Sequence, residues 1–162
     1  MFKMLRRFRN GFIALVVAAL PLALVATAPA TAGAILITKP SNYSAAETLN
    51  RLTKIMESKG ITIFARVDHA AGATKIGADL PPTELLIFGN PKLGTPLMAA
   101  NRSIAIDLPL KALAWTDSEG KTHLSYTDPA ALRARWSIKD RDAVFAKITG
   151  ALDKMTSAAT GN

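Results

Sequence analysis

Hydrophobic residues recur along this chain with two spacings, and each spacing predicts a different kind of element. A spacing of two residues is typical of strands that bury one face, and a spacing of three to four is typical of helices that bury one stripe. The first pattern, together with short apolar runs, predicts strands at 34–38, 61–68, 83–88, 104–115 and 122–126. The second predicts helices at 44–59, 69–76, 128–136 and 140–155, with a further short helix after the third strand. This order favours a single α+β domain in which an antiparallel sheet carries its helices on one face.

Residues at the ends of these segments support the predicted helix boundaries. Ser44 followed by Glu47 forms a capping-box pattern that starts the first long helix. Gly60 is placed to end that helix, because glycine readily adopts the left-handed conformation found there. Asp128 followed by Pro129 is also typical of a helix start.

The strands carry more specific expectations. In 61–68 one side of the strand is apolar, which predicts one buried face made of Ile61, Ile63, Ala65 and Val67. The strand at 83–88 is the most uniformly apolar, so we expect it at the centre of the sheet. A change of alternation near Pro109 predicts a bulge or break, since proline cannot donate within a ladder. We also expect a turn at 39–42 and a frayed tail at 157–162.

The first 32 residues have the layout of a secretory signal. Four basic residues precede an uncharged apolar run from Gly11 to Leu24, and Ala30-Thr31-Ala32 offers a cleavage site. We expect cleavage after this site, with cleavage after Ala28 as second choice, and a mature domain of residues 33–162 in the periplasm or secreted. An uncleaved anchor is the alternative, but a full span needs about 20 strongly apolar residues. After cleavage we expect no stable insertion into a membrane, and export by the general or the twin-arginine route is open.

The charge balance of the expected mature domain argues against one class of partner. The full chain has 20 basic and 12 acidic side chains, which gives a net charge of +8. Removal of residues 1–32 takes away four basic residues and no acidic one, so 16 remain against 12 and the net charge falls to about +4. That is an ordinary surface, so nucleic acid is not an expected partner.

Cysteine and histidine usage argues against metal chemistry. The chain contains no cysteine, which excludes thiolate metal sites, iron–sulfur clusters and covalent haem attachment. Its two histidines, His69 and His123, are far apart in sequence, and no closely spaced histidines or carboxylates form a zinc or copper pattern. We therefore expect no metal site and no cofactor, and we expect His123 to be a solvated residue on its strand.

The stretch from Glu84 to Asn101 holds the strongest candidate for a ligand site. An apolar strand is followed by two breaks, at 89–91 and 94–96, and then by a short helix. Functional groups often lie on loops that a rigid element holds. The sequence therefore predicts a ligand pocket, and its expected binding residues are Asn90, Lys92 and Thr95 with His69 at the rim.

The loop also suggests what such a pocket would bind. Backbone N–H groups at Gly94 and Thr95 open a helix and lie close in sequence to Lys92, which favours a small anionic ligand. The loop does not match a P-loop, because threonine rather than lysine follows the second glycine. The alternative is that its glycines and prolines only build a tight turn that Asn90 and Thr95 cap.

Three runs of the chain together carry a family resemblance: Phe64–Ala73, Pro82–Met98 and Asp107–Trp115. They resemble the bacterial domain of unknown function family 302, over essentially the whole mature chain. The family motif matches at Asp68, His69, Thr83, Phe88, Gly89, Asn90, Pro91, Gly94, Thr95, Pro96 and Leu97. The resemblance implies an α+β domain of the TATA-binding-protein-like type, often a homodimer, and it implies no activity. The TATA-binding-like label is a likeness of fold and no evidence for DNA binding.

Two classes of function follow from these observations. The favoured one is a non-enzymatic domain of the cell envelope that binds a small ligand or a partner, with no catalytic residues. The alternative is an enzyme that uses Asp68 with His69 and the Gly89–Thr95 loop, since an aspartate can orient a histidine as general base. Adjacent strand residues point to opposite faces, so this pair requires a turn at its position.

Overall fold

The computed structural model of the protein describes residues 35–162, and the expected signal, residues 1–32, lies outside the described residues. Five strands form one antiparallel sheet: β1 (Leu36–Ser41), β2 (Thr62–Asp68), β3 (Thr83–Gly89), β4 (Leu110–Thr116) and β5 (Thr122–Thr127). Their order across the sheet is β1-β5-β4-β3-β2, with each neighbouring pair antiparallel. The middle strand is therefore β4, and the expectation that 83–88 would be central is wrong by one position.

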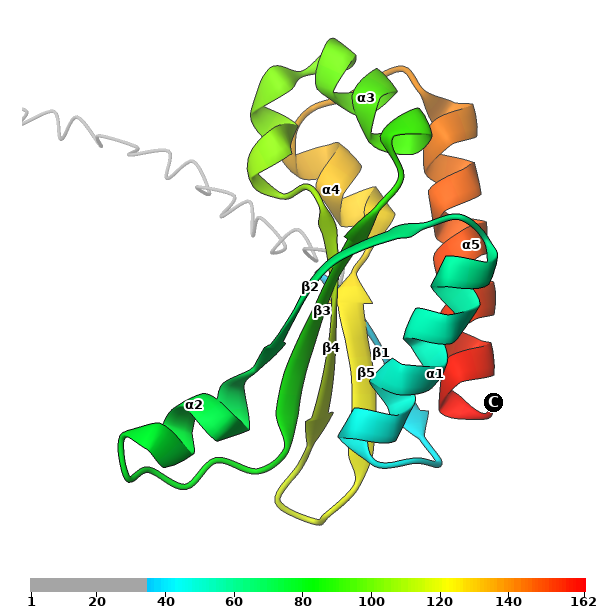
Figure 1. Ribbon diagram of the computed structural model, residues 1–162. Coiled ribbons are helices and arrows are strands. Elements are labelled where there is room, and N and C mark those ends of the chain that lie inside the picture. Colours follow the sequence, from blue (N-terminus) through cyan, green and yellow to red (C-terminus); the bar gives the residue numbers. More distant parts are fainter. Residues whose placement is uncertain (1–34) are drawn as a thin grey trace, which may run out of the picture. The chain divides into compact units, whose positions relative to one another are not determined.

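Two long helices cover one face of this sheet. The helices α1 (Ala45–Ser58) and α5 (Asp142–Thr160) pack side by side against it (Figure 1). Four shorter helical segments are α2 (His69–Lys75), α3 (Pro91–Ala100), the 3₁₀ helix η1 (Arg102–Ile106) and α4 (Pro129–Arg135). The predicted α+β class, with an antiparallel sheet and helices on one face, is confirmed. Within 35–162, the helices lack the combination of length and apolar character that crossing a membrane requires.

The core lies between the sheet and the two long helices. The helices contribute Leu49, Leu52, Met56, Ile148, Leu152 and Met155, and the sheet contributes Leu86, Phe88, Ala112, Ala114, Leu124 and Tyr126. Complete burial of one large apolar side chain stabilises the fold by about 1.5–3 kcal/mol. The two alanines belong to the middle strand, and their small size lets α1 lie close against it.

The predicted helix ends are confirmed at three places. The Ser44 hydroxyl accepts a hydrogen bond from the Glu47 N–H at 3.3 Å, and the Asp128 carboxylate accepts one from the Ala130 N–H at 2.8 Å. Gly60 has a φ of +68° just beyond α1, a conformation that residues with a Cβ rarely adopt. Local hydrogen bonding therefore sets these boundaries, as the sequence predicts.

Two strand boundaries differ from the prediction. β1 continues through Pro40, where a turn was expected, because β1 is an edge strand and such strands tolerate proline. The start of the predicted fourth strand forms η1 instead, and Asn101 caps it by accepting the Ser103 N–H at 3.0 Å. The predicted break near Pro109 is confirmed, since β4 begins only at Leu110.

β2 departs most from its expected pattern of burial. A register shift between Ile63 and Ala65 leaves Phe64 as an extra residue opposite β3. Such a bulge reverses the face that the following side chains take. Arg66 therefore points to α1 and donates hydrogen bonds of 2.6 and 3.1 Å to it. The predicted burial of Ala65 and Val67 is wrong, and Val67 is 38% exposed.

The C-terminal helix is longer than its hydrophobic stripe suggests. It runs to Thr160, so the predicted frayed tail is wrong over most of its length. Arg51 donates to the carbonyl oxygens of Ala158 and Ala159 at 3.1 Å each, and the Asn42 N–H donates to Thr160 at 3.0 Å. These long-range hydrogen bonds hold the end of α5 against α1 and the end of β1.

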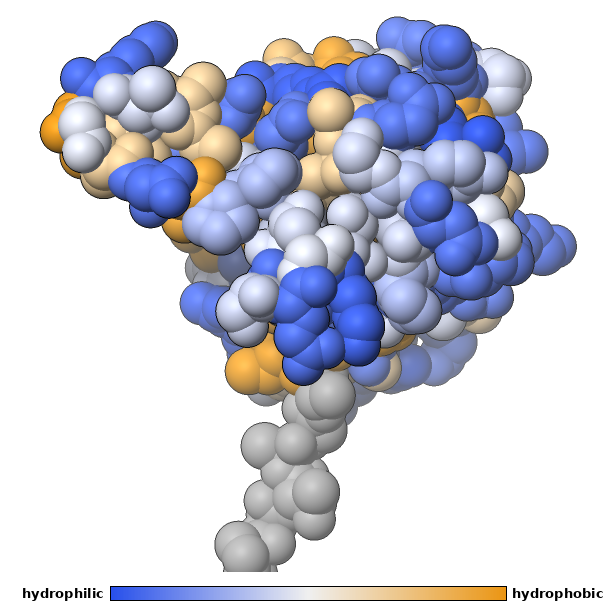
Figure 2. All heavy atoms as spheres, turned by 90° about the horizontal axis from the view of Figure 1, so that it is seen from below, coloured by the Kyte–Doolittle hydropathy of each residue, from blue (hydrophilic) through white to orange (hydrophobic). Residues whose placement is uncertain are grey.

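Neither α1 nor α5 covers the second face of the sheet, and the short helix α2 contacts β3 (Figure 1). This second face bears Val67, Leu85, Leu113 and Trp115. We call the face that carries these four residues the open face. The helix α2 and residues 76–82 together extend away from α1 and α5 (Figure 1), and we call them the arm. The helix α2 has no buried residue. Figure 2 shows this arm at the upper left, with apolar residues among its polar ones.

Candidate functional site

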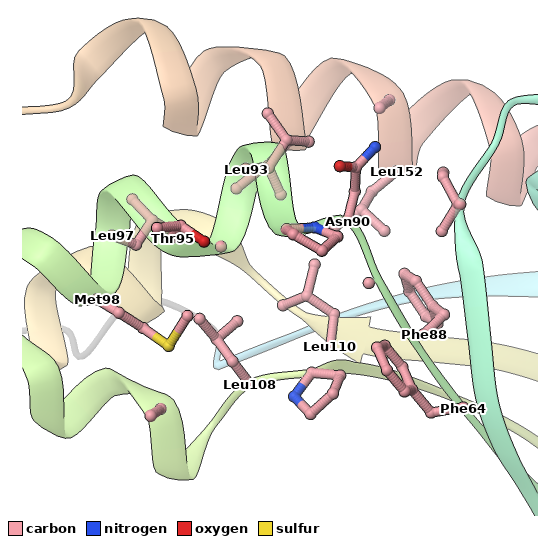
Figure 3. Close-up of a pocket in the computed structure, with 18 of the residues that line it drawn as sticks. Phe64, Phe88, Asn90, Leu93, Thr95, Leu97, Met98, Leu108, Leu110 and Leu152 are labelled. Atoms are coloured by element: carbon pink, nitrogen blue, oxygen red, sulfur yellow. The ribbon is translucent and has the colours of Figure 1, made fainter.

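A cavity of about 250 Å³ opens where β3 passes into α3. The end of β3, the helix α3, the approach to β4 and the inner side of α5 surround it (Figure 3). Its walls include Phe64, Phe88, Leu93, Met98, Leu108 and Leu152. The cavity therefore lies at the loop that the sequence marked as the candidate site.

Asn90 builds the turn from strand to helix beside this cavity. Its side-chain oxygen accepts the Lys92 N–H at 2.9 Å, and its carbonyl oxygen accepts two N–H groups of the first turn of α3 at 2.9 and 3.0 Å. Pro91 follows at the first helical position, where no N–H donor is needed. The capping role that the sequence offered as an alternative is thus present for Asn90.

Gly94 leaves open space on the cavity side of α3. A Cβ built on this residue would lie 3.8 Å from Leu108 and 4.0 Å from Met98, both of which line the cavity. These are ordinary van der Waals distances, so the position accepts a small side chain. A long apolar side chain at position 94 would extend between these two residues into the cavity.

The chemistry of the cavity wall is almost entirely apolar. Asn90 and Thr95 supply its polar side chains, and the Asn90 amide is turned toward α5 in Figure 3. Of the described residues, those that line the cavity include none with a charged side chain. Burial of an unpaired charge is costly, so this cavity favours an uncharged group. Residues 35–162 also contain no group of three or more histidine or carboxylate side chains placed to hold a metal ion.

Two of the four predicted binding residues meet at the cavity. Asn90 and Thr95 line it, as expected. Lys92 belongs to α3 but is exposed and lies outside the cavity wall. The wall therefore offers no cationic side chain to bind an anion, and the expected small anionic ligand stays a prediction.

His69 lies far from the cavity, and its expected place at the rim is wrong. The cavity adjoins the start of β2, whereas His69 follows the end of that strand. The lining residue of β2 is Phe64, and the four residue steps of extended chain from 64 to 68 span roughly 13 Å. Asp68 caps α2 by accepting the Ala71 N–H at 2.8 Å, so its carboxylate holds the helix start. The enzyme alternative needed this pair and the loop together, and the structure separates them.

A histidine–carboxylate pair exists elsewhere, at a place that sequence reasoning missed. His123 Nε2 and Asp117 Oδ2 are 2.7 Å apart, and the Trp115 ring packs on the imidazole with ring centres 4.7 Å apart. The His123 side chain is only 21% exposed, so the expectation that it is solvated is wrong. The hydrogen bond from His123, followed by backbone hydrogen bonds within the hairpin turn, holds the pKa of Asp117 below its ordinary value. The available signal was the position of His123 directly across the hairpin from Trp115.

Comparison with known proteins adds a family and a set of relatives. A family model described as "Domain of unknown function DUF302" matches residues 37–155. Two similar curated proteins are the "Fluoride-specific ion channel FluC 1" of Brucella suis biovar 1 and the "Fluoride-specific ion channel FluC 2" of Brucella melitensis biotype 1. Each is 49% identical over 117 residues, which is 71% of this chain but 46% and 43% of those proteins. The chain therefore spans less than half the length of the curated relatives it matches.

A solved structure shares the fold. It is the crystal structure of an uncharacterized conserved DUF302 protein from Bacillus stearothermophilus, with a TM-score of 0.62. The match covers 78% of this chain and 96% of that one at 19% identity, so the likeness concerns the fold alone.

Proposed function

Because the chain belongs to the family described as the domain of unknown function DUF302, we propose its function from its own cavity: the protein binds a small molecule without transforming it. The observation that carries this proposal is the cavity of about 250 Å³ at the junction of β3 and α3. Ligand sites are typically concave and mostly apolar, with a few polar groups that orient the ligand. Asn90 and Thr95 are such groups here.

The character of the wall supports binding rather than catalysis. General acid–base chemistry needs a titratable side chain at the reacting atoms, and nucleophilic chemistry needs an activated nucleophile. The Asn90 side chain already accepts a hydrogen bond from α3, and Thr95 is the hydroxyl among the lining residues. Neither residue supplies a general base.

The proposal also includes where the protein acts and in what form. We propose that the protein is exported, because residues 1–32 have the layout of a cleavable signal. We propose a homodimer because the open face and the arm are uncovered among the described residues. N-terminal sequencing of the periplasmic protein should find Gly33 first, and Met1 on membrane-bound material would contradict export.

Ligand occupancy tests the proposed function directly. Protein purified from its own compartment under non-denaturing conditions should carry a small molecule that native mass spectrometry detects. Gly94→Leu should abolish this adduct, because the leucine side chain fills space between Leu108 and Met98. Gly150→Leu is the matched control, since a Cβ at this helical position meets no atom within 4 Å. Equal occupancy in folded Gly94→Leu and Gly150→Leu would show that the cavity is not the binding site.

The relatives favour a second candidate function, in fluoride resistance. A segment 49% identical to this chain belongs to Brucella proteins that carry the name of a fluoride-specific ion channel. In those proteins this segment is part of the same chain as the rest of the protein. Joining two domains in one chain raises the effective concentration of each near the other, and this favours domains that act together. We propose that this chain acts as an accessory domain of such a channel. Cells without the protein should grow less well in fluoride and recover when it is restored, and unchanged fluoride tolerance would contradict this candidate.

A further inference from the structure

We propose that the cavity takes the hydrocarbon end of a small amphiphile, while the charged or polar head of that molecule stays outside in water. This inference rests on the proposed binding function and names the class of ligand. It is carried by the chemistry of the wall, the volume of the cavity and the residues at its mouth.

The wall suits a hydrocarbon group better than a charged one. Its side chains are aliphatic or aromatic apart from Asn90 and Thr95. The Asn90 oxygen already accepts the Lys92 N–H, and Thr95 is an exposed residue, so neither supplies a buried partner for an ion. A charged group that entered would lose its hydration without gaining an opposite charge.

The volume sets the size of the group that enters. An apolar cavity of about 150 Å³ lined by leucine, isoleucine and phenylalanine holds one benzene molecule. The cavity here, at about 250 Å³, holds a somewhat larger ring or a short chain. It lies below the range of about 300–1,000 Å³ that whole drug-sized ligands occupy, so the rest of a larger molecule extends outside.

Phe64 marks the mouth through which that molecule extends. It lines the cavity and is nevertheless 56% exposed, so its ring contacts both the cavity and solvent. It is also the extra residue of the β2 bulge, and bulges re-aim a side chain relative to its strand. Thr95 and Ala105 also line the cavity and are exposed, and Figure 3 shows Thr95 at the end of the cavity away from Phe64. An exposed aromatic ring at the mouth gives the emerging part of a chain an apolar surface to lie on.

A series of defined amphiphiles tests the proposal. Binding of linear monocarboxylates to the mature protein is measured by calorimetry, with octanedioate as the doubly charged counterpart of octanoate. Each added methylene should tighten binding about fourfold until the cavity is full, which is the equivalent of about 0.8 kcal/mol per methylene. Octanedioate, which has no uncharged end, should bind at least a hundredfold more weakly than octanoate. Affinity that is independent of chain length, or equal for octanoate and octanedioate, would overturn the proposal.

The two glycine variants separate failure of this inference from failure of the proposed function. Octanoate binding should be lost in Gly94→Leu and kept in Gly150→Leu. If octanedioate binds as well as octanoate and Gly94→Leu abolishes both, the cavity is a binding site but the ligand class is wrong. If wild type binds none of the series and Gly94→Leu leaves the native adduct unchanged, the ligand class and the proposed function are both wrong.

Discussion

Asn90 has two structural roles at the junction of β3 and α3. It lines the cavity, and its side chain caps α3 through the Lys92 N–H. A change at this residue therefore alters the helix start and the cavity together. The contribution of the cap can be separated by a comparison with Lys92, which lies on the same turn but outside the wall.

We predict that Asn90→Ala lowers the free energy of unfolding by about 0.5–2 kcal/mol, because the first turn of α3 loses its side-chain acceptor. Lys92→Ala is the control and should change stability by less than about 1 kcal/mol, since an exposed lysine contributes little. Urea denaturation of both variants measures the difference. Equal unfolding midpoints for wild type and Asn90→Ala would mean that the cap does not stabilise α3.

Through Asp117, the free energy of unfolding of the protein depends on pH in the acidic range. Hydrogen bonding to His123 and to the hairpin backbone lowers the pKa of this carboxyl from its ordinary 3.8 in the folded state. A group with a lowered pKa stabilises the fold above its unfolded pKa and loses that effect as pH falls through the folded pKa. The stability advantage of wild type over Asp117→Asn should therefore be present near neutral pH and shrink below about pH 3.8. Urea denaturation across the acidic range measures it, and an advantage that grows with acid would contradict the assignment.

At the scale of elements, local signals predicted the starts of α1 and α4, but they missed η1, the full length of α5 and the details of three strands. Ser44 and Asp128 predicted helix starts because a cap hydrogen bond forms within three residues along the chain. The bulge at Phe64 arises from pairing with β3, which a single strand does not encode. The same long-range pairing decides how far His69 lies from the cavity. The loop at Asn90 was predictable, whereas the apolar wall that α5 supplies comes from residues between Ile148 and Met155, far along the chain from the loop.

Two glycines, one inside α5 and one just after α1, test how backbone conformation contributes to the stability of the helices. We predict that Gly150→Ala stabilises the protein by about 0.5–1 kcal/mol, because alanine favours helix and its Cβ meets no atom within 4 Å. Gly60→Ala should destabilise it, since this residue ends α1 with a φ of +68°. Thermal unfolding should move the melting temperature in opposite directions for the two variants. A shift of the same sign in both would show that backbone conformation does not decide these positions.

At the scale of the whole molecule, both long helices, α1 and α5, pack on the same side of the sheet (Figure 1). Five strands of six or seven residues, spaced about 4.8 Å apart with about 3.3 Å per residue, give a face of roughly 520 Å². A stable interface needs about 800 Å² from each partner, so the open face alone falls short. The arm supplies further apolar area, with Ile76 82% exposed and Leu80 40% exposed.

We therefore predict a two-fold homodimer in which the open face and arm of one subunit contact those of the other. Val67→Lys should shift the protein to monomer, because it places a charge within the open face at a position that is already 38% exposed. Ala146→Lys, an exposed position on α5 on the opposite side of the sheet, should leave the dimer intact. Sedimentation at micromolar concentration measures the mass of wild type and both variants. A wild type that sediments as a monomer would refute the dimer, whereas a dimer that survives Val67→Lys but not Ala146→Lys would place the interface on the helical side.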